Sequence, residues 1–92
     1  MARKTILYTI PGSEHCRLAK ALLVDLKVEF DEVDLDKDDD AKEELVKVTG
    51  QWSVPALITI NADTSDVENI VIGFEPNAIK NAVTKSESTK HE

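Results

Sequence analysis

The stretch Tyr8–Cys16, YTIPGSEHC, decides the fold, because one predicted element ends within it and the next begins. The run 5–10, TILYTI, is short, apolar and rich in β-branched residues, which is typical of a buried strand. The Pro-Gly pair that follows stops the strand. Ser13 can cap a helix through its hydroxyl, and Glu14 suits the first turn because its charge complements the helix dipole. The stretch therefore predicts a strand, a tight turn and the N-terminus of a helix.

Apolar spacing predicts the remaining elements. Apolar residues at three- and four-residue intervals favour a helix over 13–26, and a stripe at positions 41, 45 and 48 favours a second helix that Gly50 ends. Further strands are expected over 28–35, 54–60 and 67–72, and a last helix from Pro76. In the strand over 28–35 the alternation slips by one residue, so either a bulge interrupts the strand or it begins late.

The resulting order, β-α-β-α-β-β-α, predicts an α/β fold class. A βαβ unit implies a parallel strand pair with a right-handed crossover, and the polar loop 61–66 predicts an antiparallel hairpin. We expect a four-stranded mixed sheet with helices on both faces. One domain over 1–83 accounts for these elements. The polar segment 84–92, TKSESTKHE, is expected to form a disordered tail.

Composition excludes several classes of function. The 92 residues include 18 acidic and 11 basic side chains, and a net charge of −7 disfavours nucleic acids and anionic membrane surfaces as partners. One cysteine excludes an intramolecular disulfide framework and a Cys-rich zinc site. The acidic run 36–40 lacks the glycine and the spaced ligands of a calcium loop, which favours solvated surface over a metal site. No membrane-spanning run or signal peptide is evident, so we expect a cytoplasmic protein.

The chemistry of the stretch centres on Ser13 and Cys16, three residues apart at a helix start. Unpaired N–H groups and the helix dipole stabilise an anion there, so a thiol at such a place has a lowered pKa and attacks disulfides as a thiolate. A second thiol three residues away would resolve the mixed disulfide. A lone Cys16 is otherwise a small buried apolar residue. His15 either tunes the thiol or is merely exposed, and Trp52 either contacts a partner or covers the core edge.

Several of these pieces, in this order and spacing, resemble the glutaredoxin branch of the thioredoxin superfamily. They are Tyr8-Thr9 at the strand end, the helix start with Cys16, Thr49-Gly50, Val54-Pro55 and Gly73, and they cover roughly residues 5–83. The resemblance implies a thioredoxin fold and a cis peptide bond between Val54 and Pro55, packed against the active-site positions. It also implies that an extended substrate segment is held at Val54, Pro55, Gly73 and Phe74.

Within the family, the run Gly73-Phe74-Glu75-Pro76 resembles the small redoxins that donate electrons to ribonucleotide reductase. Ile10 stands where glutathione-using members carry a basic residue that would pair with a glutathione carboxylate. Glutathione is therefore a poor candidate, and thioredoxin reductase is the electron source that the resemblance implies.

The chain departs from the family at one decisive position. By resemblance, the first, nucleophilic cysteine corresponds to Ser13 and the second, resolving cysteine to Cys16. A serine hydroxyl is not ionised near neutral pH and forms no disulfide, so the chain as written is expected to be inactive. Two explanations stay open: Ser13 has replaced a cysteine or selenocysteine, or the protein is a degenerate redoxin that binds without exchanging.

The resemblance thus implies a thiol–disulfide oxidoreductase that passes electrons to a disulfide-bearing protein substrate. The alternative is a non-catalytic thioredoxin-fold binding module that uses the same groove. An iron–sulfur cluster carrier is a weaker third reading, because such members use the first cysteine together with glutathione. We expect no cofactor and a monomeric protein.

Overall fold

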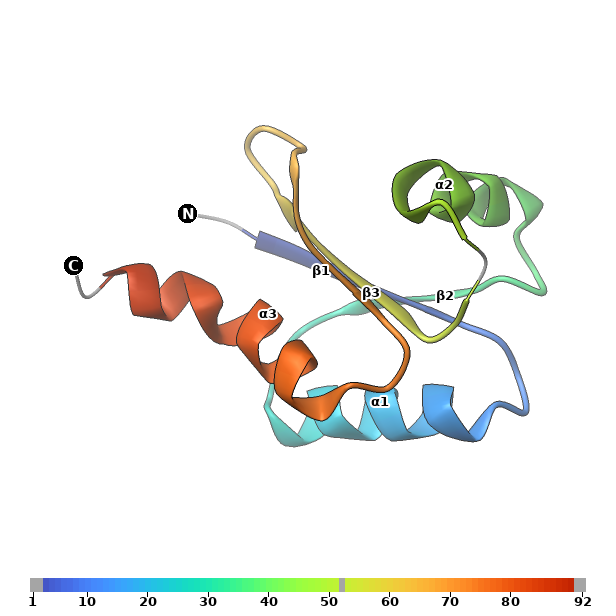
Figure 1. Ribbon diagram of the computed structural model, residues 1–92, viewed down its shortest axis with the longest axis horizontal. Coiled ribbons are helices and arrows are strands. Elements are labelled where there is room, and N and C mark those ends of the chain that lie inside the picture. Colours follow the sequence, from blue (N-terminus) through green and yellow to red (C-terminus); the bar gives the residue numbers. More distant parts are fainter. Residues whose placement is uncertain (1–2, 52, 91–92) are drawn as a thin grey trace.

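The computed structural model describes residues 3–51 and 53–90, with side chains described as far as residue 83. Within these residues four strands form one sheet in the order β2-β1-β3-β4, and three helices connect or follow them (Figure 1). The elements are β1 (Arg3–Thr9), α1 (Glu14–Asp25), β2 (Asp31–Asp34), α2 (Asp39–Thr49), β3 (Ala56–Asn61), β4 (Val67–Ile72) and α3 (Pro76–Lys90).

The strand pairing confirms the predicted mixed sheet. β1 and β2 run parallel, with Tyr8 opposite Val33, whereas β1–β3 and β3–β4 are antiparallel. Tyr8 also lies opposite Ala56, and Ala56 lies opposite Ile72. Because these partners lie at the carboxyl end of β1, the turn after β1, the start of β3 and the end of β4 meet at one end of the sheet.

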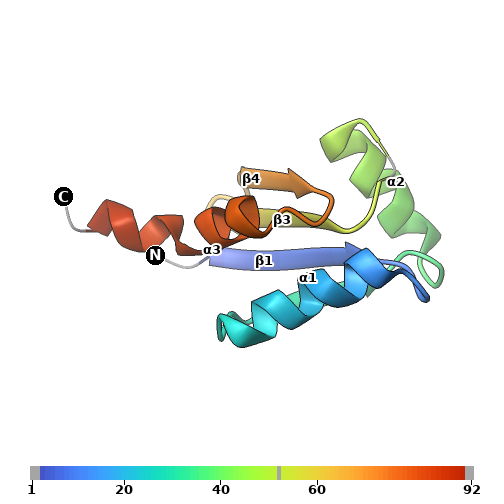
Figure 2. The same cartoon turned by 60° about the horizontal axis from the view of Figure 1, so that its bottom comes forward.

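Helices cover both faces of the sheet, as predicted. Leu7 and Leu57 pack with residues of α1 and α3 on one face. Tyr8 and Ile58 pack with Leu45 of α2 on the other. This alternation follows from the two-residue period of a strand, which sends neighbouring side chains to opposite faces. Figures 1 and 2 show α2 on the opposite side of the sheet from α1.

Local signals set the ends of α1 and α2. Ser13 caps α1, and Asp38 caps α2 by accepting a hydrogen bond from the Ala41 N–H at 3.0 Å. Gly50 ends α2 with a φ of 81°, a left-handed conformation that costs glycine little. The Ser13 cap and the Gly50 stop are the ones that the sequence predicts.

The second strand begins late. β2 starts at Asp31 and not at residue 28, which is one of the two outcomes that the slipped alternation allows. Lys27 has a φ of 59°, and the Val28 N–H donates to the Leu23 carbonyl at 3.1 Å, so the chain is still turning away from α1 there. Val28 and Phe30 pack against the core from this connection rather than from a strand.

The last helix is longer than its apolar stripe. Ile79 and Ala82 are buried residues in the first part of α3. The backbone of the helix nevertheless continues through 84–90, a segment for which the sequence predicts a disordered tail. No glycine or proline follows Pro76 to stop the helix. Residues 91–92 lie outside the described part. None of the helices described is long and apolar enough to cross a bilayer.

Candidate active site

Ser13 sits at the N-cap of α1, where the sequence places it. Its backbone is extended (φ −91°, ψ 123°), and its Oγ accepts a hydrogen bond from the Cys16 N–H at 3.3 Å. Its carbonyl accepts from the Arg17 N–H at 3.1 Å, the first bond of the helix. The side chain at position 13 therefore faces the unpaired N–H groups of the helix start, where a negative charge is stabilised.

Cys16 lies in the first turn of α1, on the helix face that packs against the sheet. It is a free thiol and only 4% exposed, and Ala19 and Leu23 continue the same buried face. Burial makes Cys16 less accessible to a large disulfide than the half-exposed Ser13. This difference matches the order in which a first and a second thiol act in the predicted mechanism.

The loop before β3 meets the end of β4 beside this helix start. The Val54–Pro55 peptide bond is cis, as predicted, and Pro55 is buried. The Pro55 carbonyl accepts a hydrogen bond from the Gly73 N–H at 2.7 Å, which fixes the two loops to each other. Gly73 has a φ of 87°, a conformation that other residues rarely adopt.

An aromatic contact connects these loops to α1. The Phe74 ring stacks on the His15 ring, with centroids 6.4 Å apart and planes at 24°. His15 is exposed, whereas Phe74 is half-buried and packs against the core. The structure thus brings Phe74 and Gly73 to the first turn of α1. The sequence predicts their place in a groove but not this stack, because the two rings lie far apart in the chain. Trp52 lies outside the described residues.

A hollow of about 360 Å³ opens on the β2 side of Ser13 and Cys16. Its wall includes Thr9, whose hydroxyl donates to the Glu32 carboxylate at 3.0 Å, and Lys20, whose Nζ lies 2.8 Å from the same carboxylate. The Lys20 hydrogen bond, helped by Thr9, lowers the pKa of Glu32. This network joins β1, α1 and β2 around the site. Sequence reasoning missed it, since nothing local marks Thr9, Lys20 or Glu32 as partners.

At the rim of that hollow, Glu14 and Arg17 form an exposed ion pair one turn apart on α1. The Arg17 side chain, through its hydrogen bond, lowers the pKa of the Glu14 carboxyl. Because both side chains are well exposed, the pair adds little to stability.

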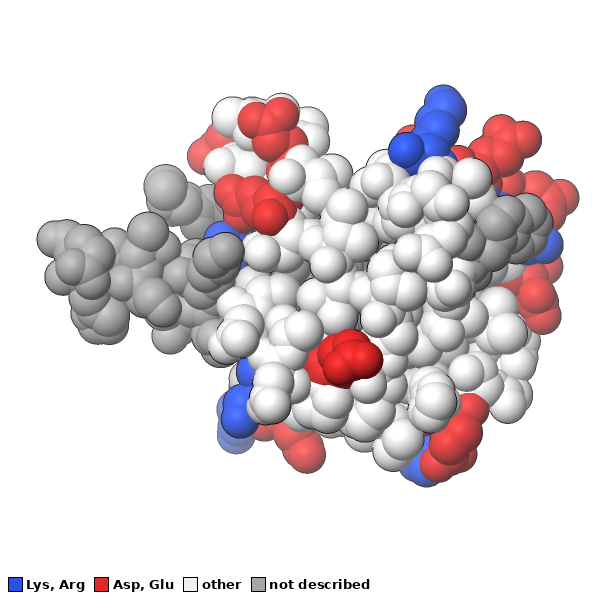
Figure 3. Space-filling view, in the orientation of Figure 1, with Lys and Arg blue, Asp and Glu red and all other residues white. Residues whose placement is uncertain are grey.

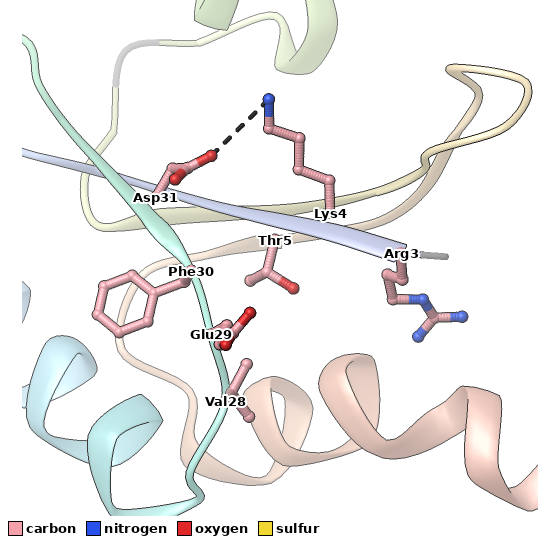
Figure 4. Close-up of a pocket in the computed structure, with 7 residues that line it drawn as sticks. All are labelled: Arg3, Lys4, Thr5, Val28, Glu29, Phe30 and Asp31. Carbon is pink, nitrogen blue, oxygen red and sulfur yellow. Dashed lines mark ion pairs between the residues drawn. The ribbon is translucent and has the colours of Figure 1, made fainter. Parts of the chain in front are cut away.

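A second hollow, of about 530 Å³, lies at the other end of β1 (Figure 4). Its two basic groups are already paired: Lys4 lies 3.7 Å from Asp31 across the hollow, and Arg3 lies 2.8 Å from Glu68 outside it. The Phe30 ring turns away from Thr5, towards the core. The lining groups therefore do not converge on a common point. Across residues 3–51 and 53–90 no group of three or more His, Cys, Asp or Glu side chains could hold a metal ion.

The surface around the loops is largely uncharged. Figure 3 shows a broad face without basic side chains, with an acidic one near its middle, and acidic side chains at the right-hand edge. Val54, Gly73 and Phe74 are all partly exposed and carry no charge.

The sheet order, the helix start after β1 and the cis-proline loop together define a thioredoxin-like protein. Solved structures agree: the glutaredoxin from Methanosarcina mazei Go1 superimposes with a TM-score of 0.70 at 30% identity, covering 87% of this chain and 77% of that one. The family model described as glutaredoxin matches residues 5–63, more than half of the chain, so the protein belongs to the glutaredoxin family. The match includes Ser13, Cys16 and Val54-Pro55 but ends before Gly73 and Phe74.

Two curated relatives come from viruses. The gene 56 protein of Mycobacterium phage D29 is 32% identical over 73 residues, which cover 79% of this chain and 74% of that protein. The gene 56 protein of Mycobacterium phage L5 is 29% identical over the same length. The aligned segment covers 79% of this chain but only 65% of the length of the L5 protein.

Proposed function

We propose that this protein is a glutaredoxin-type redox protein whose docking site receives a disulfide-bearing protein segment, and in which Ser13 occupies the position of the attacking thiol. Family membership supports a redox-type function. As the chain is written, it would bind substrate without turning it over, because Ser13 supplies no thiolate and Cys16 is shielded.

The observation that carries this proposal is the pairing of an N-cap side chain with a buried thiol one turn later. The Ser13 Oγ already accepts the Cys16 N–H at 3.3 Å, so a sulfur at position 13 would face the same donor. A thiolate is favoured at such a helix start because the N–H groups and the dipole offset its charge.

The substrate segment would lie along Val54 as an added strand. Val54 precedes the β1–β3 ladder, which begins at Ala56, so that pairing does not use its backbone groups. An extended peptide commonly binds by pairing with free backbone groups of this kind. Gly73 and Phe74 would then form the opposite wall of the groove, since Gly73 is bonded to Pro55.

With a cysteine at position 13, the protein could reduce a substrate disulfide by thiol–disulfide exchange. Its thiolate attacks one sulfur of the substrate disulfide, which releases the other substrate sulfur as a thiolate that takes up a proton. The Cys16 thiolate, having lost its proton to solvent, then attacks the mixed disulfide. The internal 13–16 disulfide forms, and the second substrate thiol leaves. Two electrons have passed to the substrate, and a reductase must return them.

The test compares the protein as written with Ser13→Cys in a coupled assay that follows NADPH oxidation. The chain as written should reduce a small disulfide no faster than the uncatalysed reaction, with either thioredoxin reductase or glutathione as donor. Ser13→Cys should gain turnover, and thioredoxin reductase should serve better because Ile10 offers no charge to a glutathione carboxylate.

Each outcome has a distinct meaning. Turnover by the unmodified chain would make Cys16 the nucleophile. A folded Ser13→Cys protein that binds substrate but never turns over would support a non-catalytic binding module instead. A clear preference for glutathione would leave the chemistry intact and overturn the proposed link to the ribonucleotide-reductase branch.

A further inference from the structure

The two edges of the sheet differ in how they are protected. One edge is β2, which has four residues, DEVD, most of them acidic. The other edge is β4, which has six residues, VENIVI, without proline, lysine or arginine and with glutamate as its one acidic residue. Free sheet edges are usually short, charged or interrupted, because an exposed apolar edge pairs readily with another chain. By these criteria β2 is protected, whereas β4 is open to pairing.

The hydrogen bonds at the end of β4 show which of its backbone groups face outwards. The Gly73 N–H donates to the Pro55 carbonyl at 2.7 Å, so Gly73 faces β3. Residues of an antiparallel strand alternate between facing their partner strand and facing away from it. In the register that pairs Ala56 with Ile72, Ile70 and Ile72 therefore direct their N–H and C=O groups away from β3. No strand of the described chain lies on that side, so the sheet does not use these groups.

Apolar side chains accompany these outward backbone groups. Ile70 lies opposite Ile58, which packs in the core on the α2 face of the sheet. Val67 lies opposite Ile60, which belongs to the same face. Val67 and Ile70 are each 42% exposed, and α2 lies towards the end of the sheet opposite the 61–66 hairpin (Figure 1). A strand added at this edge would cover both side chains by contact with its own alternate residues.

Carboxylates lie at both ends of this edge. Asp66 directly precedes β4, and Glu75 follows the Gly73–Phe74 turn that ends it. Both are exposed, and neither forms an ion pair with any residue that the structure describes, whereas Glu68 within the strand pairs with Arg3. Figure 3 shows acidic side chains over the hairpin and an uncharged surface where β4 runs.

An extended segment of another protein satisfies these features together. A strand supplies N–H and C=O groups for the edge and alternate side chains for Val67 and Ile70, and basic residues at its ends would compensate Asp66 and Glu75. A second copy of this chain fits less well. Antiparallel pairing of two β4 edges would place Glu75 of one copy beside Asp66 of the other, and each copy carries a net charge of −7.

We propose that the free edge of β4 binds an extended segment of a partner protein, apolar at alternate positions and basic at its ends. This surface does not include Ser13 or Cys16, and the inference does not depend on a redox reaction there. Because β4 leads directly into Gly73, which is bonded to Pro55, a partner held at this edge is also brought beside the proposed docking groove.

The test uses the unmodified protein and two synthetic peptides of alternating valine and threonine, one with lysine and the other with glutamate at each end. The lysine peptide should bind with a Kd below about 1 mM at low salt, about fivefold or more tighter than the glutamate peptide. Binding should slow hydrogen exchange at the Ile70 and Ile72 amides, as measured by NMR, because the added strand accepts hydrogen bonds from them. No binding, equal affinity for the two peptides, or unchanged exchange at these amides would overturn the inference.

A variant and its matched control locate the binding surface. Ile70→Glu puts a charge on the edge and should weaken binding of the lysine peptide by about fivefold or more, although the added charge attracts lysine. Val24→Glu adds the same charge on α1, at a position 60% exposed, and should leave the Kd within about twofold of the parent. Equal effects of the two substitutions would contradict a site at β4.

A second pair of variants tests the charged ends of the edge. Asp66→Asn with Glu75→Gln should bring the affinity ratio of the two peptides close to one, because the compensating carboxylates are gone. Asp25→Asn with Glu29→Gln removes the same charge from exposed positions outside β4 and should leave the ratio unchanged. A ratio that responds equally to both pairs would mean that only the net charge of the protein attracts the peptide.

Light scattering coupled to size-exclusion chromatography distinguishes a partner from a second copy. We expect a monomer at concentrations up to about 0.1 mM. A dimer that Ile70→Glu dissociates would assign the edge to self-association and overturn the inference. Circular dichroism identifies loss of folding in any variant. If Ile70→Glu does not fold, hydrogen exchange at the Ile70 and Ile72 amides of the unmodified protein decides the outcome.

Discussion

In the proposed function, Ser13 and Cys16 show how a single position can separate structure from chemistry. The Ser13 hydroxyl caps α1 by accepting a hydrogen bond from the Cys16 N–H, and the Cys16 side chain is buried one turn later. In the function we propose, the geometry of a dithiol site is therefore retained while its first thiol is absent. Serine is among the favoured N-cap residues, so its presence there costs the fold nothing.

The cap itself can be tested. Ser13→Ala removes the acceptor for the Cys16 N–H and should lower the free energy of unfolding by about 1 kcal/mol. Ser13→Thr keeps a hydroxyl at the same place and should differ from the parent by only a few tenths of a kcal/mol. Urea denaturation of the three proteins measures these differences. An alanine variant as stable as the parent would show that the cap is not stabilising.

Glu32 gives the network beside the site a pH dependence. Its pKa is lowered in the folded protein, so its contribution to stability is present above the unfolded pKa, near 4.5, and is lost as the pH falls through the folded value. Glu32→Gln should therefore reduce stability at neutral pH and flatten its acid dependence.

The size of that effect is limited by solvent, since the Glu32 side chain is 35% exposed. We expect less than about 1 kcal/mol. Glu29→Gln, which removes an exposed carboxyl with no ion pair in the described structure, is the matched control. Equal acid dependence of the two variants in urea titrations between pH 3 and about 7 would contradict a stabilising role for the network.

Helix and strand ends that are set by local sequence signals could be predicted, whereas features that depend on long-range contacts could not. The β1–turn–α1 unit is predicted from sequence because its Pro-Gly stop and serine cap are local, and Gly50 ends α2 for the same reason. The late start of β2 stays ambiguous from sequence, because Val28 and Phe30 are apolar for packing rather than for pairing. The Thr9–Glu32 bond and the His15–Phe74 stack depend on register and loop geometry that no single segment encodes.

Helix α2 is held to its face of the sheet by few buried residues. Leu45 is 1% exposed and is the only fully buried residue of the helix. Leu45→Ala should cost about 2–4 kcal/mol through lost burial and the cavity left behind. Val48→Ala, at a position 40% exposed, should cost less than about 1 kcal/mol. Comparable losses for the two variants in chemical denaturation would mean that α2 is anchored elsewhere.

For the whole molecule, the sheet brings four separated segments to one end. The turn after β1, the start of α2, the loop before β3 and the end of β4 meet there because β1 runs parallel to β2 and antiparallel to β3, and β3 runs antiparallel to β4. The uncharged residues Val54, Gly73 and Phe74 and the acidic start of α2 lie at this end as a consequence of that topology. The order of elements and the cis-proline loop were predictable from sequence, whereas the side chains that surround the site were not.

We propose that positions 13 and 16 form a glutaredoxin dithiol site that lacks only its first thiol. Ser13→Cys should oxidise under a mild oxidant and lose two hydrogen atoms by intact mass, and a reductant should restore them, because residues three apart at a helix start can reach disulfide distance. Ser13→Cys combined with Cys16→Ala should show no such change within one chain. A folded Ser13→Cys protein that forms no internal disulfide would contradict the claim.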